Sequence, residues 1–499
     1  MSTYPKQGAT AALQAFLSTP LNVTLARHRE RIPQHAAVGL FHSAAAGIPA
    51  YQRFLANHHI NASAIKNFAD FQQLPLMTKK DYILAYPLKE RCHQGKLDEN
   101  DMVAVSSGST GTPIAWPRAI QHELDIATRF EHIFKEGFAA DTRSTLAVIC
   151  FALGTWVGGM YTANCCRYLS LKGYPITLAT PGNNKDEIFR VINDIGAGFD
   201  QVVLLGYPPF IKDVIDSGIA RNIDWPRFNI KMVLAGEVFS EEWRDLVCQR
   251  AGAGNPCLDT ASLYGTADAG VLGNETPLSI TLRKFFSSHP EAARELFGES
   301  RLPTLIQYDP LSRFFETHEG TLVVTGDNGV PLIRYHIADK GGIVAYDEML
   351  RFAADHDGKP GKEILNKSVI PLPFVYVFGR ADFTVSFFGA NIYPENVTVG
   401  LEQPGIQQWV SGKFVLQVKE SADGNKLLSI TVELLPDITA DEEKKSVIAA
   451  SIQRQLLRLN SEFAHYVPAE YQQPEIVLKN TGDPEYFPVG VKHRYTRKH

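Results

Sequence analysis

The spacing of apolar residues changes along the 499-residue chain. From about residue 8 to 96, apolar positions recur mainly at helical intervals, which predicts a helical entry segment in which Thr78 caps a helix. From Leu146 to about Tyr335, short apolar runs such as QVVLLG and IKMVLAGE alternate with helical stretches such as KDEIFRVINDIGAG. This alternation predicts βαβ units around a largely parallel sheet.

A different pattern begins near Gly379. The runs KFVLQVKE and KLLSITVELL flank the turn SADGN, as expected for a β-hairpin. A helix over roughly Asp441 to Phe463 and a strand in PEIVLKN follow. We therefore expect an α/β fold with a large domain over residues 1–381 and a small α+β domain over residues 382–499.

Composition narrows the classes of protein. Hydrophobic residues make up 44% of the chain, charged residues 21%, and the formal net charge is -5. These values are typical of a globular protein with small-molecule partners, and they disfavour a nucleic-acid footprint or a polybasic membrane patch. The six cysteines form no CxxC pair, so we expect reduced, mostly buried thiols. The N-terminus lacks signal-peptide features and no apolar run is long enough to span a bilayer, so the cytoplasm is the expected compartment.

The run VSSGSTGTPIAW, from Val105 to Trp116, predicts a phosphate-holding loop. Gly108 and Gly111 permit close backbone approach, and hydroxyl groups surround them. The hydroxyl residues are Ser106, Ser107, Ser109 and Thr110. Thr112 stands where the P-loop of ordinary NTPases has lysine, so this loop is of another kind. The alternative is a plain Ser/Gly turn.

Two further motifs follow predicted strands. In LAGEVFSEEW, Gly236 and Glu237 end a buried strand and Ser240 begins a helix, which is a usual place for a ligand crevice. In SLYGTADAG, Tyr264 could stack on a purine and Asp268 could hold Mg²⁺. The alternatives are a core aromatic residue and a turn-forming aspartate.

Two charged motifs lie nearer the domain boundary. In IRYHIADKGG, Asp339 precedes a predicted Gly-Gly turn, and its carboxylate could accept both hydroxyls of a ribose. The alternative is an ion pair or turn contact involving Asp339 and Arg334. In VFGRADFTV, Arg380 and Asp382 directly precede the change in composition, where a simple linker is the alternative.

The order of these motifs resembles that of adenylate-forming enzymes, most closely the phenylacetate-CoA ligase branch of the acyl-CoA synthetases. The resemblance covers nearly the whole chain and includes the entry segment IPAYQRFLANHHINASAIKNFADFQQLPLMTKKDY. It implies a large N-terminal adenylation domain with parallel or mixed sheets and helices, comprising the entry segment (1–100) and the ATP and acyl pocket (101–381). A small mobile C-terminal lid domain is implied over residues 382–499.

The resemblance also implies roles for matching residues. The Ser106–Gly111 loop would cover the β- and γ-phosphates of ATP, and Asp268 would bind Mg²⁺. Asp339 would hold the ribose hydroxyls and Arg380 would support ribose and phosphate. The residues around adenine and the phosphates would be Gly236, Glu237, Tyr264, Gly265 and Thr266.

In the C-terminal part, the resemblance implies that Asp382 is a hinge and that Gly389 and Asn391 line the thiol tunnel. Lys492 would reach the reacting carboxylate, although Lys498 is close by in the sequence. The chain departs from the family pattern at several positions. Thr112 replaces a lysine, Ala267 a hydroxyl residue, Asp268 a glutamate, His336 an arginine and Ala338 a glycine.

The implied reaction has two steps and uses ATP, Mg²⁺ and coenzyme A. A carboxylate attacks ATP to form an acyl-adenylate, and a thiol then displaces AMP. The acyl pocket is expected in Phe151–Cys166 around Trp156, Gly158 and Gly159, where close helix packing is the alternative. Transfer to a carrier-protein phosphopantetheine and a non-catalytic nucleotide-binding role are also open. The sequence does not distinguish aryl, arylacetic and fatty acids, nor does it give the oligomeric state or pathway.

Overall fold

The structure is a computed structural model. It describes residues 6–105, 114–155, 157–299, 302–356, 370–380, 385–388, 390–420, 426–460, 463–464, 467–488, 493 and 495–496. Several predicted site residues lie outside these ranges, namely Ser106, Ser107, Gly108, Ser109, Thr110, Gly111, Trp156, Asp382, Gly389, Lys492 and Lys498. The side chains of Arg380 and Asn391 also lie outside the description.

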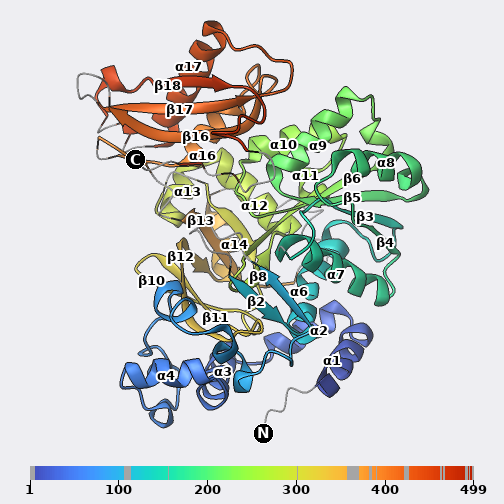
Figure 1. The fold of residues 1–499 in the computed structure, drawn as a ribbon, viewed down its shortest axis with the longest axis vertical. Coiled ribbons are helices and arrows are strands. Elements are labelled where there is room, and N and C mark those ends of the chain that lie inside the picture. The colour runs from blue at the N-terminus through green and yellow to red at the C-terminus, as the bar shows by residue number, and fades with distance from the viewer. Residues whose placement is uncertain are drawn as a thin grey trace.

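The chain begins with the predicted helical entry segment, drawn in blue in Figure 1. Its α-helices are α1 (Lys6–Ser18), α2 (Leu21–Arg29), α3 (Pro33–Gly47), α4 (Pro49–Asn57) and α5 (Phe68–Phe71). Thr78 caps the short helix η2 (Lys79–Ile83) as predicted, since its hydroxyl accepts a hydrogen bond from Asp81 N at 3.2 Å. Buried aromatic side chains such as Phe41, Tyr51 and Tyr82 pack α3, α4 and η2 together.

A single eleven-stranded sheet forms the centre of the described large part. In spatial order its strands are β10 (Phe314–His318), β11 (Thr321–Gly326), β12 (Leu332–Val344), β13 (Phe374–Arg380), β9 (Thr304–Gln307), β8 (Gly270–Asn274), β7 (Thr260–Thr266), β6 (Ile230–Ala235), β5 (Gln201–Gly206), β3 (Thr145–Ile149) and β4 (Ile176–Ala179). A separate hairpin pairs β1 (Met102–Val105) with β2 (Ala115–Arg118).

Strands β4, β3, β5, β6 and β7 pair in parallel, which confirms the predicted βαβ units. Alternate β3 residues face opposite cores, because Val148 packs with one set of helices and Ile149 with the other. Helices on both faces cover this half of the sheet. They are α6 (Ile120–His132) and α7 (Val157–Leu171) on one face, and α8 (Lys185–Ile195), α9 (Pro208–Ala220) and α10 (Glu241–Ala251) on the other.

Beyond β7 the pairing is antiparallel, whereas the sequence predicted a largely parallel sheet up to about Tyr335. Short connections account for the antiparallel pairs β7–β8 and β11–β12. Only residues 267–269 join β7 to β8, and only residues 327–331 join β11 to β12. A parallel crossover needs a dozen or more residues, so such short links can join only antiparallel neighbours.

The predicted Gly-Gly turn after Asp339 is wrong. Gly341 and Gly342 lie inside β12 and pair with Val377 and Tyr376 of β13. A Cβ on Gly341 would lie 2.1 Å from Tyr376 O, so the close approach of the two strands requires glycine here. The remaining helices of this part are α11 (Pro256–Asp259), α12 (Pro277–Ser288), α13 (Pro290–Phe297) and α14 (Tyr346–Asp355).

The C-terminal part has its own sheets and core, and it occupies the orange and red end of Figure 1. The hairpin of β16 (Val410–Glu420) and β17 (Lys426–Leu434) is extended by β18 (Glu475–Lys479), which pairs in parallel with β17. Its remaining elements are β14 (Val385–Phe387), β15 (Ala390–Ile392), α16 (Pro394–Leu401) and α17 (Glu442–Leu459). These elements confirm a small α+β unit, while the boundary at residue 382 stays a prediction.

All six cysteines are free, and five of them are buried. Cys165 and Cys166 lie in α7 among apolar residues, which agrees with the buried thiols expected from the sequence. No helix in the described ranges is long and apolar enough to cross a membrane.

Candidate active site

The predicted residues of the second and third motifs lie at one edge of the sheet. Strands β6 and β7 are parallel neighbours with Ala235 opposite Leu263, so Gly236 and Tyr264 follow side by side. Gly236 has a φ of +91°, and a Cβ there would lie 2.5 Å from the ring of Tyr207. This position therefore requires glycine and brings the chain across the carboxyl end of the sheet, where ligands of α/β proteins commonly bind.

Tyr264 and Asp339 meet directly although 75 residues separate them. The Tyr264 hydroxyl donates to Asp339 Oδ2 at 2.6 Å. Asp339 is opposite Arg380 in the β12–β13 register, so the backbones of these two predicted residues are adjacent. Arg334 instead pairs with Glu316 of β10 at 3.2 Å. Three separate predicted motifs thus converge on one sheet edge.

Asp268 lies in the turn between β7 and β8 and is only 8% exposed. Its Oδ2 atom accepts a hydrogen bond from the Tyr335 hydroxyl at 2.5 Å. Thr266 Oγ1 accepts from Ala269 N at 2.9 Å and so closes the same turn. At Gly265 a Cβ would lie 2.5 Å from Gly270 O, so the backbones on the two sides of this turn approach closely.

One departure from the family pattern has a visible backbone consequence. Ala338 has a φ of +64°, in the left-handed region that glycine adopts with little strain. The backbone at this position is therefore one that favours glycine, although the residue is alanine. At the neighbouring departure, His336 Nε2 and Thr321 Oγ1 share a hydrogen bond of 2.7 Å.

The C-terminal tail reaches this sheet edge. Tyr495 OH donates to Glu237 Oε2 at 2.6 Å, and Leu416 N donates to Tyr495 O at 2.7 Å. The tail is therefore held on β16 and contacts the loop after β6 at the same time. Burial and the negative charge of Glu237 raise the pKa of Tyr495 well above its ordinary value, so its hydroxyl keeps its proton.

A second contact joins the same loop to the C-terminal part. The side chains of Ser240, the N-cap of α10, and Glu402, at the end of α16, share a short hydrogen bond. Burial raises the pKa of Glu402 to about 8, and nearby Glu242 adds to the rise. The Ser240 hydrogen bond and the cations Lys212 and Arg283 oppose it. Glu402 is therefore mainly protonated at neutral pH.

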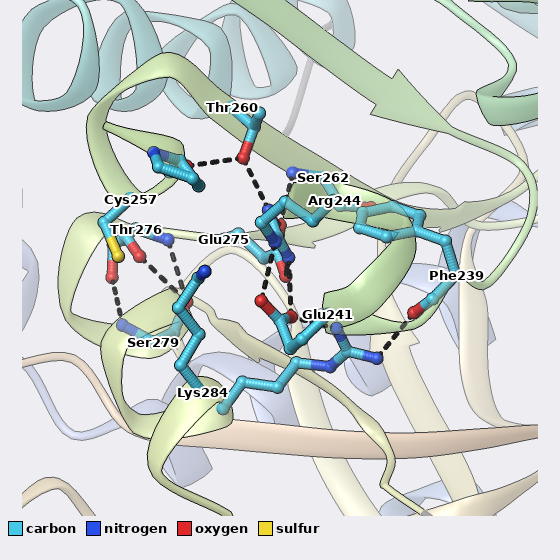
Figure 2. A network of polar contacts seen from close by, with 12 residues as sticks. Phe239, Glu241, Arg244, Cys257, Thr260, Ser262, Glu275, Thr276, Ser279 and Lys284 are labelled. Carbon is cyan, nitrogen blue, oxygen red and sulfur yellow. Dashed lines mark hydrogen bonds and ion pairs between the residues drawn. The ribbon is translucent and has the colours of Figure 1, made fainter. Parts of the chain in front are cut away.

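A buried network of ion pairs fixes the first turn of α10 (Figure 2). Arg244 pairs with Glu241 at 3.0 Å and with Glu275 at 2.6 Å, and Arg283 also pairs with Glu241. Burial opposes ionisation of Glu241, but the two arginines hold its pKa below the ordinary value. Arg283 additionally donates to Phe239 O at 2.7 Å, which fixes the loop that carries Glu237 and Ser240.

The sequence did not single out Tyr495, Glu402 or Tyr335 as site residues. In the sequence, Tyr335 only marks the end of an apolar stretch. Glu402 is one of many acidic residues that nothing in the local sequence marks as buried. Tyr495 is three residues after Lys492, so its place in the tail was the one available signal.

The glycines of the predicted acyl pocket contact the chain before α7. A Cβ on Gly159 would lie 2.2 Å from Ala152 O, and one on Gly158 would lie 3.3 Å from the Phe151 ring. Close packing therefore accounts for Gly159, and its role in an acyl pocket stays a prediction. A cavity of about 240 Å³ lies elsewhere, between α3, α6 and the residues before β10, and includes none of the predicted residues among its described lining.

No protein-family model matches the sequence, and no curated protein matches it. The fold does match solved structures of 2-hydroxyisobutyryl-CoA ligase. Its postadenylation complex with R3-HIB-AMP is 13% identical and covers 94% of this chain and 89% of that chain, with a TM-score of 0.66. Its thioesterification complex with 2-HIB-AMP and CoA is 14% identical and covers 93% and 89%, with a TM-score of 0.52. The chain thus shares the fold of these structures, the fold of adenylate-forming ligases.

Proposed function

We propose that the protein activates a carboxylic acid with ATP to an acyl-adenylate and then transfers the acyl group to a thiol, coenzyme A. The convergence of Tyr264, Asp339 and Glu237 with the C-terminal tail at one sheet edge carries this proposal. The motifs that supply these residues are far apart in the sequence, and their meeting matches the roles that the resemblance implies. The likeness to 2-hydroxyisobutyryl-CoA ligase supports the same class of reaction.

The surroundings of Asp268 fit a magnesium ion that is held mainly by the phosphates of bound ATP. The described residues contain no cluster of three or more His, Cys, Asp or Glu side chains able to cage a metal. Mg²⁺ in nucleotide enzymes is commonly held by one or two carboxylates together with phosphate oxygens and water. In the proposed enzyme, Asp268 supplies that carboxylate, and the ion would neutralise triphosphate charge when bound.

The protein's own contribution is positioning and charge. Asp339 accepts from the ribose hydroxyls, and Tyr264, which already contacts Asp339, lies against the base. Lys492 and Arg380 compensate the negative charge that develops as the substrate carboxylate approaches the α-phosphate. The Ser106–Gly111 loop donates hydrogen bonds to the outer phosphates.

The observed arrangement of the two parts suits the first half-reaction. The TM-score is higher with the postadenylation complex of 2-hydroxyisobutyryl-CoA ligase than with its thioesterification complex. In this arrangement Tyr495 of the C-terminal tail contacts Glu237. We therefore assign the Tyr495–Glu237 contact to the adenylation step. The phenylacetate-CoA ligase branch is part of the proposal and makes arylacetic acids the first substrates to try.

The test is carboxylate-dependent exchange of labelled pyrophosphate into ATP with Mg²⁺, using aryl, arylacetic, short and long fatty, and amino acids. Exchange with one class of acid establishes adenylation and identifies the substrate class. Release of AMP is then measured with coenzyme A and with a phosphopantetheinyl carrier protein, which separates the two acceptors. Absence of exchange with every acid, in protein that binds ATP, contradicts the proposal and favours a non-catalytic nucleotide-binding role.

A further inference from the structure

Arg118, the last residue of β2, is a fully buried cation held by carbonyl oxygens. The residue is 1% exposed. Nη1 donates to Asn328 O at 2.6 Å and to Pro117 O at 3.1 Å, and Nη2 donates to Ala267 O at 2.8 Å. These three acceptors are neutral carbonyl oxygens, and burying a guanidinium among such groups costs free energy, which suggests that its position has a function.

The three acceptors belong to different segments that meet at Asp268. Ala267 directly precedes Asp268 in the β7–β8 turn, Asn328 belongs to the β11–β12 loop, and Pro117 belongs to β2. The guanidinium therefore connects the backbone of the Asp268 turn to two neighbouring segments. Because its donors form a rigid planar fork, the directions of these bonds are fixed together.

The surrounding backbone leaves little room for these segments to shift. Gly329 has a φ of +91°, and a Cβ there would lie 2.1 Å from Pro117 O. Gly270 has a φ of +71°, and a Cβ there would meet the Asn328 amide at 2.5 Å. In the amide orientation that gives both its oxygen and its nitrogen a suitable partner, Asn328 Oδ1 also accepts from Arg118 Nη2 and from Gly270 N, both at 3.0 Å. The turn is thus held at both ends, by Ala267 O and by Gly270 N.

We propose that Arg118 is a positioning residue that fixes the β7–β8 turn and so directs the Asp268 carboxylate toward the metal–nucleotide complex. This inference rests on the proposed function, because it assigns Mg²⁺ binding to Asp268. Tyr335 of β12, which donates to Asp268 Oδ2, orients the carboxylate. Arg118 acts on the backbone of the turn and Tyr335 acts on the side chain.

The test compares Arg118→Met and Arg118→Lys with Arg129→Met. Arg129 is a matched control because it is also buried, at 2% exposure, but belongs to α6 and pairs with Asp309 at 3.5 Å. The first readout is hydrogen–deuterium exchange of peptides over residues 265–271 and 327–330. We expect Arg118→Met to increase exchange in both segments at least tenfold, Arg118→Lys to increase it less, and Arg129→Met to leave both unchanged.

The second readout is pyrophosphate exchange over a series of Mg²⁺ concentrations. We expect Arg118→Met to raise the Mg²⁺ concentration for half-maximal rate about tenfold and to lower kcat, with the KM for the acid unchanged and partial recovery in Arg118→Lys. If the wild-type protein shows no pyrophosphate exchange, the proposed function is refuted. The hydrogen–deuterium exchange result still decides whether Arg118 holds the turn. The inference is overturned if folded Arg118→Met has the wild-type hydrogen–deuterium exchange in both segments and the wild-type Mg²⁺ dependence of pyrophosphate exchange. If Arg118→Met does not fold, the same comparisons are decided with Arg118→Lys.

Discussion

The hydroxyl of Tyr495 lies 2.6 Å from Glu237 Oε2, which joins the C-terminal tail to the loop after β6 across 258 residues of sequence. The same loop meets the C-terminal part again through Ser240 and Glu402. Both contacts start from a segment that the buried Glu241–Arg244 network holds rigidly. Among the described residues, this loop therefore connects the C-terminal part to the predicted nucleotide site.

Removing the Tyr495 hydroxyl tests that link. In Tyr495→Phe we expect the adenylation rate to fall about tenfold, the loss expected for one charge-assisted hydrogen bond worth about 1.5 kcal/mol. The transfer of a supplied acyl-adenylate to coenzyme A should change less, since we assign the contact to the first half-reaction. The two steps are measured separately by pyrophosphate exchange and by single-turnover thioester formation. Tyr471→Phe is the control, because its ring packs against Phe388 within the C-terminal part. A larger loss in thioester formation than in adenylation contradicts the assignment.

Glu402 should make stability depend on pH. Its pKa is raised from 4.5 to about 8 in the structure, first by burial and then by Glu242. The folded protein therefore holds a proton that the unfolded chain releases between these values, and stability falls as the pH rises from about 4.5 to 8. The contribution is fully present below pH 4.5 and is lost as the pH passes through 8. The Glu402→Gln variant should lack this dependence.

The measurement is urea unfolding of both proteins at several pH values from 5 to about 8.5. We expect wild type to lose stability relative to Glu402→Gln across this range. Glu442→Gln serves as the control, because Glu442 has an 88% exposed side chain that pairs with Lys445 on the surface of α17. Parallel pH curves for wild type and Glu402→Gln would show that Glu402 is ionised throughout.

Removing one charged residue from the buried network in Figure 2 should lower the free energy of unfolding. Glu275→Gln leaves Arg244 buried with part of its compensating charge removed, and we expect about 3 kcal/mol of destabilisation. The double variant Arg244→Met/Glu275→Gln should lose less than the sum of the single changes, because both partners leave together. Glu187→Gln, which breaks an exposed pair with Arg190, should cost less than about 0.5 kcal/mol. Additive effects in the double variant argue against a coupled network.

The sequence predicted the parallel half of the sheet well because β3, β4, β5 and β6 are short apolar runs that are each followed by a helix. The N-cap of α10 at Ser240 and the helix α8 at Lys185–Ile195 were both visible in local pattern. The antiparallel half was less predictable. Gly341 and Gly342 resemble a turn in sequence, and only the approach of Tyr376 from β13 gives the reason for them.

The site was predictable only where residues resemble a known motif. Tyr264, Asp268 and Asp339 could be proposed in this way, and Tyr264 and Asp339 do meet. Arg118 and Glu402 could not be, because their importance depends on partners far away in the sequence. An arginine after Trp116 and a glutamate after α16 look ordinary until the carbonyl groups and the serine around them are known.

Asp339 gives the most direct test of nucleotide recognition. Its Oδ2 atom accepts from Tyr264, and the residue is only 8% exposed, so its carboxylate is held in a fixed direction beside Arg380 of the neighbouring strand. In Asp339→Asn, one carboxylate oxygen is replaced by an amide group that cannot accept from a ribose hydroxyl. We expect the KM for ATP to rise about 30-fold, corresponding to about 2 kcal/mol, with the KM for the acid unchanged.

Tyr264→Phe separates orientation of Asp339 from direct contact with the nucleotide. It removes the hydrogen bond but keeps the ring, so we expect a rise in the KM for ATP smaller than that of Asp339→Asn. Asp355→Asn, at the end of α14, is the control for loss of a carboxylate elsewhere in the large part. Pyrophosphate exchange at varied ATP and fixed, saturating acid measures all three variants. An Asp339→Asn protein with the wild-type KM for ATP means that Asp339 holds Tyr264 and the β7–β12 packing rather than the ribose.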